Sequence, residues 1–140
     1  GLLDHVTEEL DKEQFLPAAC QGTVGVQSKF GSELKKVFAT INHYETEIES
    51  LTERQVLKNI NANCNSPVSV YAKIVDNMIA VKCDIFDHDG IKLFSKTISD
   101  KKDNYIKIGN TLAETILNDL GQEKINKLNE LNDFDYSPST

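Results

Sequence analysis

The sequence predicts an α+β fold in which a three-stranded antiparallel sheet is covered on one face by helices, in the order α-β-β-β-α. Between residues 68 and 98, apolar residues alternate with polar ones, as they do in half-buried strands. On either side, at 44–60 and 104–131, apolar residues recur at the three- and four-residue spacing of an amphipathic helix. A sheet this small has one face to bury, and the two helical regions can cover it.

Length and charge limit the class of protein. The chain has 140 residues, of which 22 are acidic and 15 are basic, giving a formal net charge of -7. These values are typical of one or two small soluble domains, and no apolar run approaches the roughly 18 residues of a membrane-spanning helix. The acidic balance argues against a phosphate-binding surface, so we expect neither nucleic acid nor membrane as a partner. Because the chain begins with neither Met nor a signal peptide, we interpret it as a piece of a longer protein.

Residues 1–31 fit the predicted sheet-and-helix domain poorly. Residues 15–27 read as a loop that leads into a strand at 22–28, yet no nearby segment can pair with it. We expect the sheet that this strand joins to lie in a part of the protein that precedes Gly1. In this chain alone the strand could be disordered, fold back or pair with a second copy, and the sequence does not choose among these.

The first two helical segments have recognisable starts and stops. An apolar stripe over residues 32–42 follows Ser32, which is the expected N-cap. The next helix is expected to begin at a capping box of Asn42 and Glu45. It must end before residues 61–67, because three Asn, one Ser and one Pro in that segment favour turns.

Three strands and a helical region complete the domain. Turns are expected at Asp76-Asn77 and Asp89-Gly90, with the third strand at 91–98, and the long helix is expected to stop at Gly121. The core positions predicted from the two periods are Val68, Val70, Ala72, Ile74, Ile79, Val81, Cys83, Ile85, Leu112, Ala113, Ile116, Leu117 and Leu120, followed by Ile125, Leu128 and Leu131 in a short last helix. The polar tail 133–140 is expected to be frayed.

The three cysteines, at positions 20, 64 and 83, are an odd number at irregular spacing. They do not suggest a disulfide framework, they fit a reducing compartment such as the cytoplasm, and we expect no metal site. Cys83 falls on the apolar face of a strand, so we expect a buried side chain. Cys64 lies in the polar segment 61–67, where burial is not the natural explanation, so a nucleophilic role stands beside that of an incidental loop cysteine.

Two short motifs favour turns over ligand sites. Residues 20–25, Cys-Gln-Gly-Thr-Val-Gly, resemble a degraded dinucleotide-binding loop, but no helix follows directly. Residues 87–90, Asp-His-Asp-Gly, suggest a calcium loop, but Ile85 and Lys96 would then occupy positions that need carboxylates.

A double-stranded RNA-binding module has the same order of elements and is the alternative function. Such a module needs a basic surface, whereas residues 43–131 contain 11 basic and 14 acidic side chains. The composition therefore argues against this alternative.

Several short segments, read together, resemble the porphobilinogen deaminase (hydroxymethylbilane synthase) family. They are Leu16-Pro-Ala-Ala-Cys-Gln-Gly-Thr-Val-Gly-Val26, Ile41-Asn-His-Tyr-Glu-Thr46, Thr52-Glu-Arg54, and Asn61-Ala-Asn-Cys64-Asn-Ser-Pro-Val68 with Tyr71-Ala72. Their order and spacing are similar to those of the carboxy-terminal part of that three-domain enzyme. The resemblance divides the chain into a stub of the preceding catalytic domains (1–38), a cofactor-attachment domain (39–132) and a polar tail (133–140).

The resemblance implies that Cys64 is the attachment point of a dipyrromethane cofactor, held as a thioether. The family enzyme, a cytoplasmic transferase, uses this cofactor as a primer for four porphobilinogen units and releases hydroxymethylbilane for heme and other tetrapyrroles. Gln21 and Gly22 match a family segment that lines the cofactor cleft. The family's catalytic Asp and its carboxylate-binding Arg and Lys residues lie in the preceding domains. The resemblance therefore implies that this part alone is inactive and that the full enzyme is a monomer. The unpaired strand of the stub could let the isolated chain self-associate.

Three positions depart from the family pattern. Cys20 stands where the family has Gly, Gln27 stands where it has Glu, and Ala62-Asn63 replaces two glycines before the cofactor cysteine. The loop change matters most, because two glycines give a flexibility that Ala-Asn only partly supplies. We expect it to affect the mobility of the loop more than attachment of the cofactor.

Overall fold

The computed structural model describes residues 1–130 and confirms the predicted α+β order. One antiparallel sheet contains β1 (Val68–Val75), β2 (Met78–Phe86) and β3 (Lys92–Lys101) in that order. The helices are α1 (Leu34–Ala39), α2 (Tyr44–Asn59), α3 (Tyr105–Leu120) and α4 (Gln122–Glu130), with 3₁₀ turns at Leu2–His5 and Lys102–Asn104. Leu131 and the predicted tail lie outside the described residues. Within residues 1–130, no helix combines the length and apolar character needed to cross a membrane.

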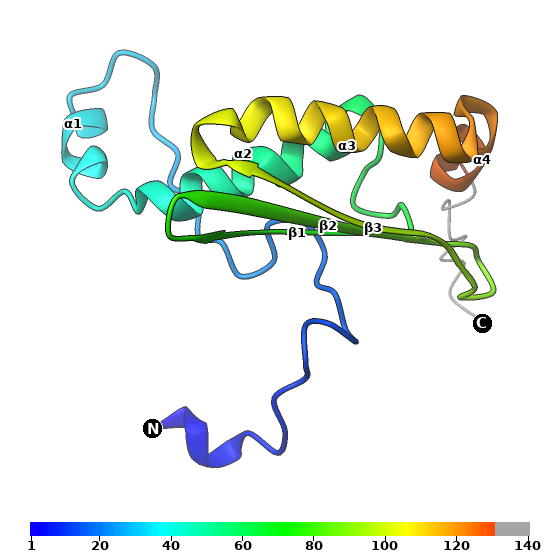
Figure 1. Cartoon of the computed structure of the whole chain (residues 1–140). Helices are drawn as coiled ribbons and strands as arrows, with labels where there is room; N and C mark the ends of the chain where they lie inside the picture. The colour runs from blue at the N-terminus through cyan, green and yellow to red at the C-terminus, as the bar shows by residue number, and fades with distance from the viewer. Residues whose placement is uncertain (131–140) are drawn as a thin grey trace, which may run out of the picture.

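The domain has two layers (Figure 1). Helices α2, α3 and α4 cover one face of the sheet, as predicted, and the amino-terminal chain passes the other face. There Lys12 donates to the Tyr71 hydroxyl at 3.3 Å, and the Lys82 ammonium contacts the Glu13 carboxylate at 2.9 Å. The predicted turn at Asp76 is confirmed, since β1 ends one residue before it and its φ of +57° suits a two-residue hairpin.

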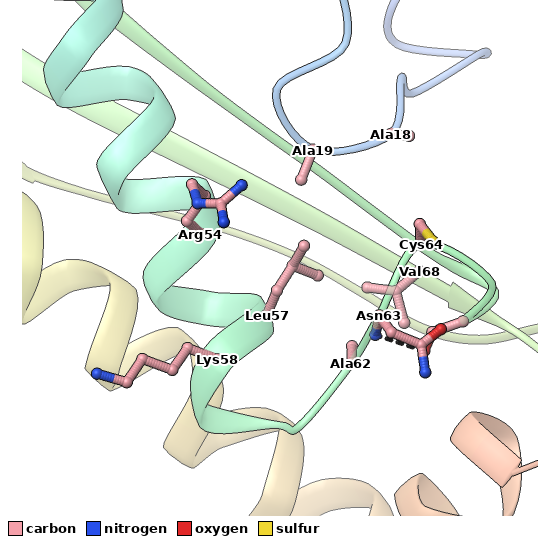
Figure 2. A pocket seen from close by; sticks show the side chains of 10 residues that line it. Ala18, Ala19, Arg54, Leu57, Lys58, Ala62, Asn63, Cys64 and Val68 are labelled. Atoms are coloured by element: carbon pink, nitrogen blue, oxygen red, sulfur yellow. Dashed lines mark hydrogen bonds between the residues drawn. The ribbon is translucent and has the colours of Figure 1, made fainter. Parts of the chain in front are cut away.

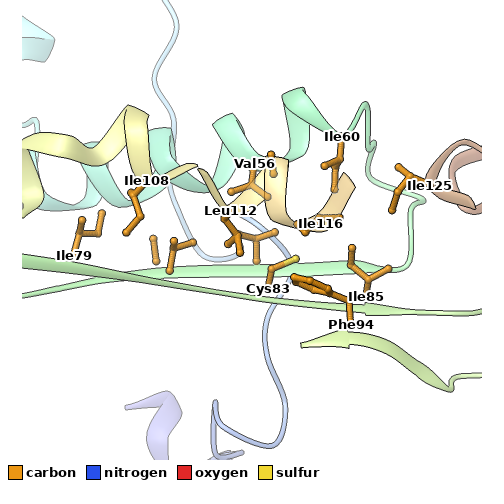
Figure 3. Packing of buried hydrophobic residues seen from close by; sticks show 14 of the residues in the cluster. Val56, Ile60, Ile79, Cys83, Ile85, Phe94, Ile108, Leu112, Ile116 and Ile125 are labelled. Atoms are coloured by element: carbon orange, nitrogen blue, oxygen red, sulfur yellow. The ribbon is translucent and has the colours of Figure 1, made fainter. Parts of the chain in front are cut away.

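The core lies between the sheet and the helices (Figure 3). On β2 the four predicted inward residues all have 0% exposure, and α3 places its apolar stripe against them. Burial of each such aliphatic side chain contributes about 1.5–3 kcal/mol, so this alternation determines which face the helices cover. The buried residues of the core are Ile48, Val56, Ile60, Val70, Ala72, Ile74, Ile79, Val81, Cys83, Ile85, Phe94, Ile108, Leu112, Ala113, Ile116, Ile125 and Leu128.

Two carboxylates of α2 protect the free edge of β1. The Ala72 N–H donates to Glu53 Oε1 and the Ile74 N–H donates to Glu49 Oε1, both at 2.8 Å. Glu49 and Glu53 are one helical turn apart, so one helix face satisfies two successive outward-facing amides of the edge strand. The backbone pairing also explains why Glu53 is only 5% exposed.

Both predicted helix starts before the sheet are wrong by one residue. The N-cap of α1 is Glu33 and not Ser32, although the Ser32 hydroxyl still accepts a hydrogen bond from an amide of the first turn. The N-cap of α2 is His43 and not Asn42, because His43 Nδ1 accepts the Thr46 N–H at 3.3 Å. An imidazole nitrogen can satisfy a helix amide as a carboxamide oxygen does, but His is outside the residue types on which the prediction relied.

The expected strand at 22–28 is absent from the described structure, and α1 is shorter than the predicted 32–42. In this region Val24 is 89% exposed and Phe30 is 102% exposed; Leu34, Val37 and Ile41 of the predicted stripe are exposed as well, whereas Phe38 is half-buried. The β1 edge cannot receive the segment in register, because the α2 carboxylates already occupy two of its amides. The exposed apolar side chains of this region therefore have no partner among residues 1–130.

Candidate functional site

A pocket of about 400 Å³ lies where the end of α2, the segment 61–67 and the turn containing Ala18 and Ala19 meet (Figure 2). Pockets that bind small molecules have volumes of about 300–1,000 Å³. Cys64 lines this pocket and is exposed. The structure thus places the candidate nucleophile at a cavity large enough for an organic group.

The pocket lining combines apolar and cationic groups. Leu57, Ala62 and Val68 line it and also pack against the hydrophobic core. Arg54 and Lys58, one turn apart on α2, line it as well, and both are exposed. This combination suits an organic ring that bears acidic substituents.

The three cysteines have different environments. Cys83 is fully buried in the core as predicted, and burial raises its pKa far above the ordinary value, which keeps it an inert thiol. Cys20 is partly buried, its thiol donates to the Ser50 carbonyl at 3.7 Å, and burial together with the nearby Glu53 raises its pKa. Cys64 is the exposed thiol of the three.

Hydrogen bonds that end on α4 hold the segment 61–67 in place. Asn129 Nδ2 donates to the carbonyls of Ile60 at 3.1 Å and Asn61 at 2.9 Å, and Asn129 Oδ1 accepts the Ser66 hydroxyl at 2.7 Å. The Ser66 hydroxyl in turn accepts the Asn63 N–H at 2.9 Å. One side chain therefore braces the segment on both sides of Cys64.

The asparagines of this segment shape its backbone. Asn61 has a φ of +52°, a left-handed conformation that Asn tolerates better than most residues. Asn63 Oδ1 accepts the Asn65 N–H at 2.8 Å in a local turn. The turn predicted from the Asn-rich composition is confirmed, and these side chains serve the loop itself.

Gln21 and Gly22 lie next to the pocket wall and not among its lining residues. On this side the wall is formed by Ala18 and Ala19. Gln21 Oε1 accepts the Ala18 N–H at 3.1 Å, so Gln21 stabilises the turn that carries the wall. Gly22 has a φ of +87°, a conformation that glycine adopts readily.

Glu53 connects this turn to the folded domain. Its Oε2 accepts the Cys20 N–H at 2.6 Å, while its Oε1 is bound to the edge of β1. Burial raises the pKa of Glu53, although both backbone hydrogen bonds favour the carboxylate. Cys20 has a φ of +59°, a left-handed conformation that glycine adopts more readily, which fits the glycine that the resemblance implies at this position.

Sequence reasoning missed four residues of the site. Glu53 and Arg54 belong to the segment Thr52-Glu-Arg54, but the sequence assigns no role to either residue. No sequence pattern points to Lys58 or Asn129. Asn129 contacts Ser66 across 63 residues of sequence, a separation that local periodicity cannot bridge. In the described part of the chain, no group of three or more His, Cys, Asp or Glu side chains could hold a metal ion.

Comparison with known proteins gives one family. The family described as "Porphobilinogen deaminase, C-terminal domain" matches residues 47–118, which include Cys64 and most of the described domain. Clostridium botulinum strain Hall has a relative named porphobilinogen deaminase that is 35% identical over 118 residues, covering 84% of this chain and 40% of the relative. Relatives with the same name are 29% identical in Clostridium acetobutylicum, covering 81% of this chain and 38% of the relative, and 26% identical in Campylobacter lari, covering 79% and 36%.

The chain thus spans about 40% of the length of the Clostridium botulinum relative. The matched region begins in α2 and ends in α3, so it contains the whole sheet and the segment that carries Cys64. The chain belongs to the porphobilinogen deaminase family, and residues 47–118 correspond to its C-terminal domain.

Proposed function

We propose that this chain is the carboxy-terminal part of a porphobilinogen deaminase and that Cys64 carries its dipyrromethane cofactor as a thioether. The observation that carries the proposal is the position of Cys64, an exposed thiol at a pocket within the region matched to the family. When bound, the cofactor supplies the primer to which four porphobilinogen units are added to give hydroxymethylbilane.

The residues around Cys64 fit such a group. The pocket has room for an organic group, and Leu57, Ala62 and Val68 offer apolar surface for the faces of its rings. A cysteine sulfur is a soft nucleophile that can form a carbon–sulfur bond. The braced segment 61–67 holds the attachment point in a fixed place relative to α2 and α4.

The chemistry of chain extension belongs to the remainder of the parent protein. This chain has a net charge of -7 and only two cations at its pocket, whereas the repeated acidic substituents of the substrate require many. We therefore expect the catalytic Asp and the main carboxylate-binding residues to lie in the part of the protein outside this chain. We also expect a monomeric enzyme in the cytoplasm, with residues 1–38 belonging to its preceding domains.

The test uses the parent protein and three matched samples: the wild type, Cys64→Ser and Cys20→Ser. We expect the cofactor mass, located by peptide mapping, and the pink Ehrlich colour in the wild type and in Cys20→Ser, and neither in Cys64→Ser. Colour retained in Cys64→Ser would contradict attachment at this residue. The 140-residue chain alone, incubated with porphobilinogen, should form no bilane, and any turnover would contradict the proposed division of labour.

No contact among residues 1–130 favours the RNA-binding alternative. The outer face of β1 and β2 is partly covered by residues 12 and 13, where Lys82 is paired with Glu13. We expect no detectable binding of double-stranded RNA at moderate salt.

A further inference from the structure

The shape of the pocket beside Cys64 depends on the shape of the segment 61–67. Four of the residues that line the pocket belong to this segment, namely Ala62, Asn63, Cys64 and Ser66. Asn129 lies on α4 and is not among the lining residues, yet it contacts the segment on both sides of Cys64. A side chain outside the pocket therefore controls the part of its wall that carries the thiol.

The carboxamide of Asn129 uses its donor and its acceptor on the chain around Cys64. Nδ2 donates to the carbonyl oxygens of Ile60 and Asn61, which precede Cys64, and Oδ1 accepts the hydroxyl of Ser66, which follows it. Ile60 is the C-cap of α2, and carbonyl groups at the end of a helix lack partners within that helix. A carboxamide suits this position, because a carboxylate only accepts and an ammonium only donates.

The Ser66 hydroxyl extends this contact to the residue beside the thiol. It donates to Asn129 at 2.7 Å and accepts the Asn63 N–H at 2.9 Å, and Ser66 is only 9% exposed. Because both hydrogen bonds are satisfied, the buried hydroxyl has one favoured orientation. Asn63 directly precedes Cys64, so α4 restrains the backbone from which the thiol projects.

Helix α4 gives Asn129 a fixed position relative to the core. The side chains of Ile125 and Leu128 are 1% and 6% exposed, and both belong to the hydrophobic core. Gly121, with a φ of +81°, allows the change of direction between α3 and α4 that brings α4 to the end of the helical layer (Figure 1). The restraint on the segment is thus tied to the packing of the domain.

We propose that Asn129 is a positioning residue for Cys64, which holds the thiol at the pocket through Ser66 and through the carbonyls of Ile60 and Asn61. In the loaded protein, the same contacts would set the direction in which a group bound to Cys64 leaves the segment. The identity of that group rests on the proposed function. The restraint on the Cys64 side chain does not, and it can be measured without the cofactor.

A nitroxide spin label on Cys64 measures this restraint. The Cys64 thiolate attacks the sulfenyl sulfur of a methanethiosulfonate reagent, which forms a mixed disulfide and releases methanesulfinate. The 140-residue chain with Cys20→Ser leaves Cys64 as the accessible thiol, because Cys83 is fully buried. The readout is the electron paramagnetic resonance line shape, resolved into a restrained and a mobile population of the label.

We expect Asn129→Leu to raise the mobile-to-restrained ratio about tenfold, because three hydrogen bonds around the segment are lost together while the side-chain volume is nearly kept. Asn129→Asp keeps the acceptor for Ser66 and loses the donor, so its ratio should be intermediate. Ser66→Ala should also raise the ratio. Added to Asn129→Leu, it should change the ratio little, because both substitutions remove the same connection.

Two controls separate the local restraint from overall stability. Asn126→Leu is matched to Asn129→Leu, since Asn126 is exposed on the same helix and accepts the Gln122 amide at 2.9 Å within α4. We expect it to keep the ratio of the parent chain. A label on Glu114→Cys, at an exposed position of α3 in a chain with Cys64→Ser, should give the same spectrum with and without Asn129→Leu.

An equal ratio in Asn129→Leu and Asn126→Leu overturns the proposal. A change at position 114 as large as that at Cys64 overturns it too, because the effect would then be one of overall stability. If Asn129→Leu does not fold, Asn129→Asp and Ser66→Ala decide by the same comparison. Failure of the proposed function has a different signature, namely a parent protein without cofactor on Cys64 whose label there still depends on Asn129.

Discussion

Glu53 lies between the turn at residues 18–22, helix α2 and strand β1, and both of its carboxylate oxygens accept backbone amides. Burying a carboxylate is unfavourable unless its hydrogen bonds are satisfied, and here two amides satisfy it. These two contacts hold the wall of the pocket against the domain. Glu53 is thus a positioning residue for the site and does not itself line the pocket.

The raised pKa of Glu53 predicts a pH dependence of stability. Because the folded state holds the proton more tightly than the unfolded state, this contribution is fully present below the ordinary pKa of 4.5 and is lost as the pH rises through the folded pKa. Between pH 4.5 and 7 we therefore expect the wild type to lose stability relative to Glu53→Gln, which does not titrate. Urea unfolding at a series of pH values measures this difference.

Two comparisons make the Glu53 test specific. Glu45→Gln changes an exposed residue of the same helix and should give a curve parallel to that of the wild type. For Asp84, burial is outweighed by hydrogen bonds from Lys92 and Ser95, which lower its pKa, so its contribution is lost only as the pH falls below about 3.8. Parallel curves for the wild type and Glu53→Gln from pH 4.5 to 7 would show that Glu53 titrates alike in both states.

At this scale the sequence identified residues whose environment follows from their own segment. Cys83 could be placed in the core by strand alternation, and Cys64 could be placed in an exposed turn by the Asn-rich composition around it. Arg54 and Asn129 could not be identified, because their roles depend on contacts with segments distant in sequence. The role of Gln21 at the cofactor cleft stays a prediction; its side-chain oxygen accepts the Ala18 amide beside the pocket.

At the scale of elements, α2 and α3 approach closely at Gly109. A Cβ at this position would lie 3.0 Å from the Thr52 carbonyl oxygen and 3.0 Å from Gln55 Cβ. Asn110 next to it accepts the Gln55 amide at 2.8 Å and the Asn59 amide at 2.7 Å, which fixes the alignment of the two helices. The helices therefore have little freedom to move apart.

We expect Gly109→Ala to lower the free energy of unfolding by about 1–3 kcal/mol, because the new methyl group overpacks the helix contact. Helix propensity alone predicts the opposite sign, since Ala is favoured over Gly by about 1 kcal/mol in a helix interior. Thr111→Ala, at an exposed position on the same helix, is the matched control and should be neutral or slightly stabilising. Denaturant unfolding decides whether overpacking or helix propensity dominates. A stabilised Gly109→Ala variant would mean that the two helices accommodate the methyl group without a loss of stability.

The elements that the sequence predicted well are those whose pattern matches their own burial. The three strands and the long helices each have a regular apolar face, and the structure buries it in one core. The stripe over 32–42 and the expected strand at 22–28 have the same kind of pattern without burial in this chain. An apolar pattern shows which side chains of a segment need to be buried, and it does not show which other segment buries them.

Among residues 1–130, the amino-terminal chain contacts the folded domain through one stretch, residues 11–23. Residues 1–10 are all exposed, and the hydrogen bond from Val6 to Leu3 and the ion pair of Gly1 with Asp4 both lie within this segment. Residues 11–23 contact the domain through Lys12, Glu13 and Cys20. The domain from Tyr44 onward has its own core, so it should fold without the first ten residues.

We therefore expect a chain that begins at residue 11 to melt at the same temperature as the full chain. A chain that begins at residue 24 should melt several degrees lower, because Glu53 then loses the Cys20 amide and a buried acceptor without a partner costs about 1–3 kcal/mol. Thermal unfolding followed by circular dichroism compares the three chains. Equal melting temperatures for the second and third would show that the turn at 18–22 adds nothing to stability.

The brace that Asn129 provides limits how a group on Cys64 can change position. Because the segment is held on both sides of Cys64, its backbone can move little. A group bound to Cys64 would then move mainly by rotation about the bonds of the cysteine side chain and about its own bonds. Its reach is then a fixed radius about one point of the domain surface. A displacement beyond this radius requires the domain to turn as a rigid body, and a small angle of rotation about a remote axis then becomes a large displacement at the tip.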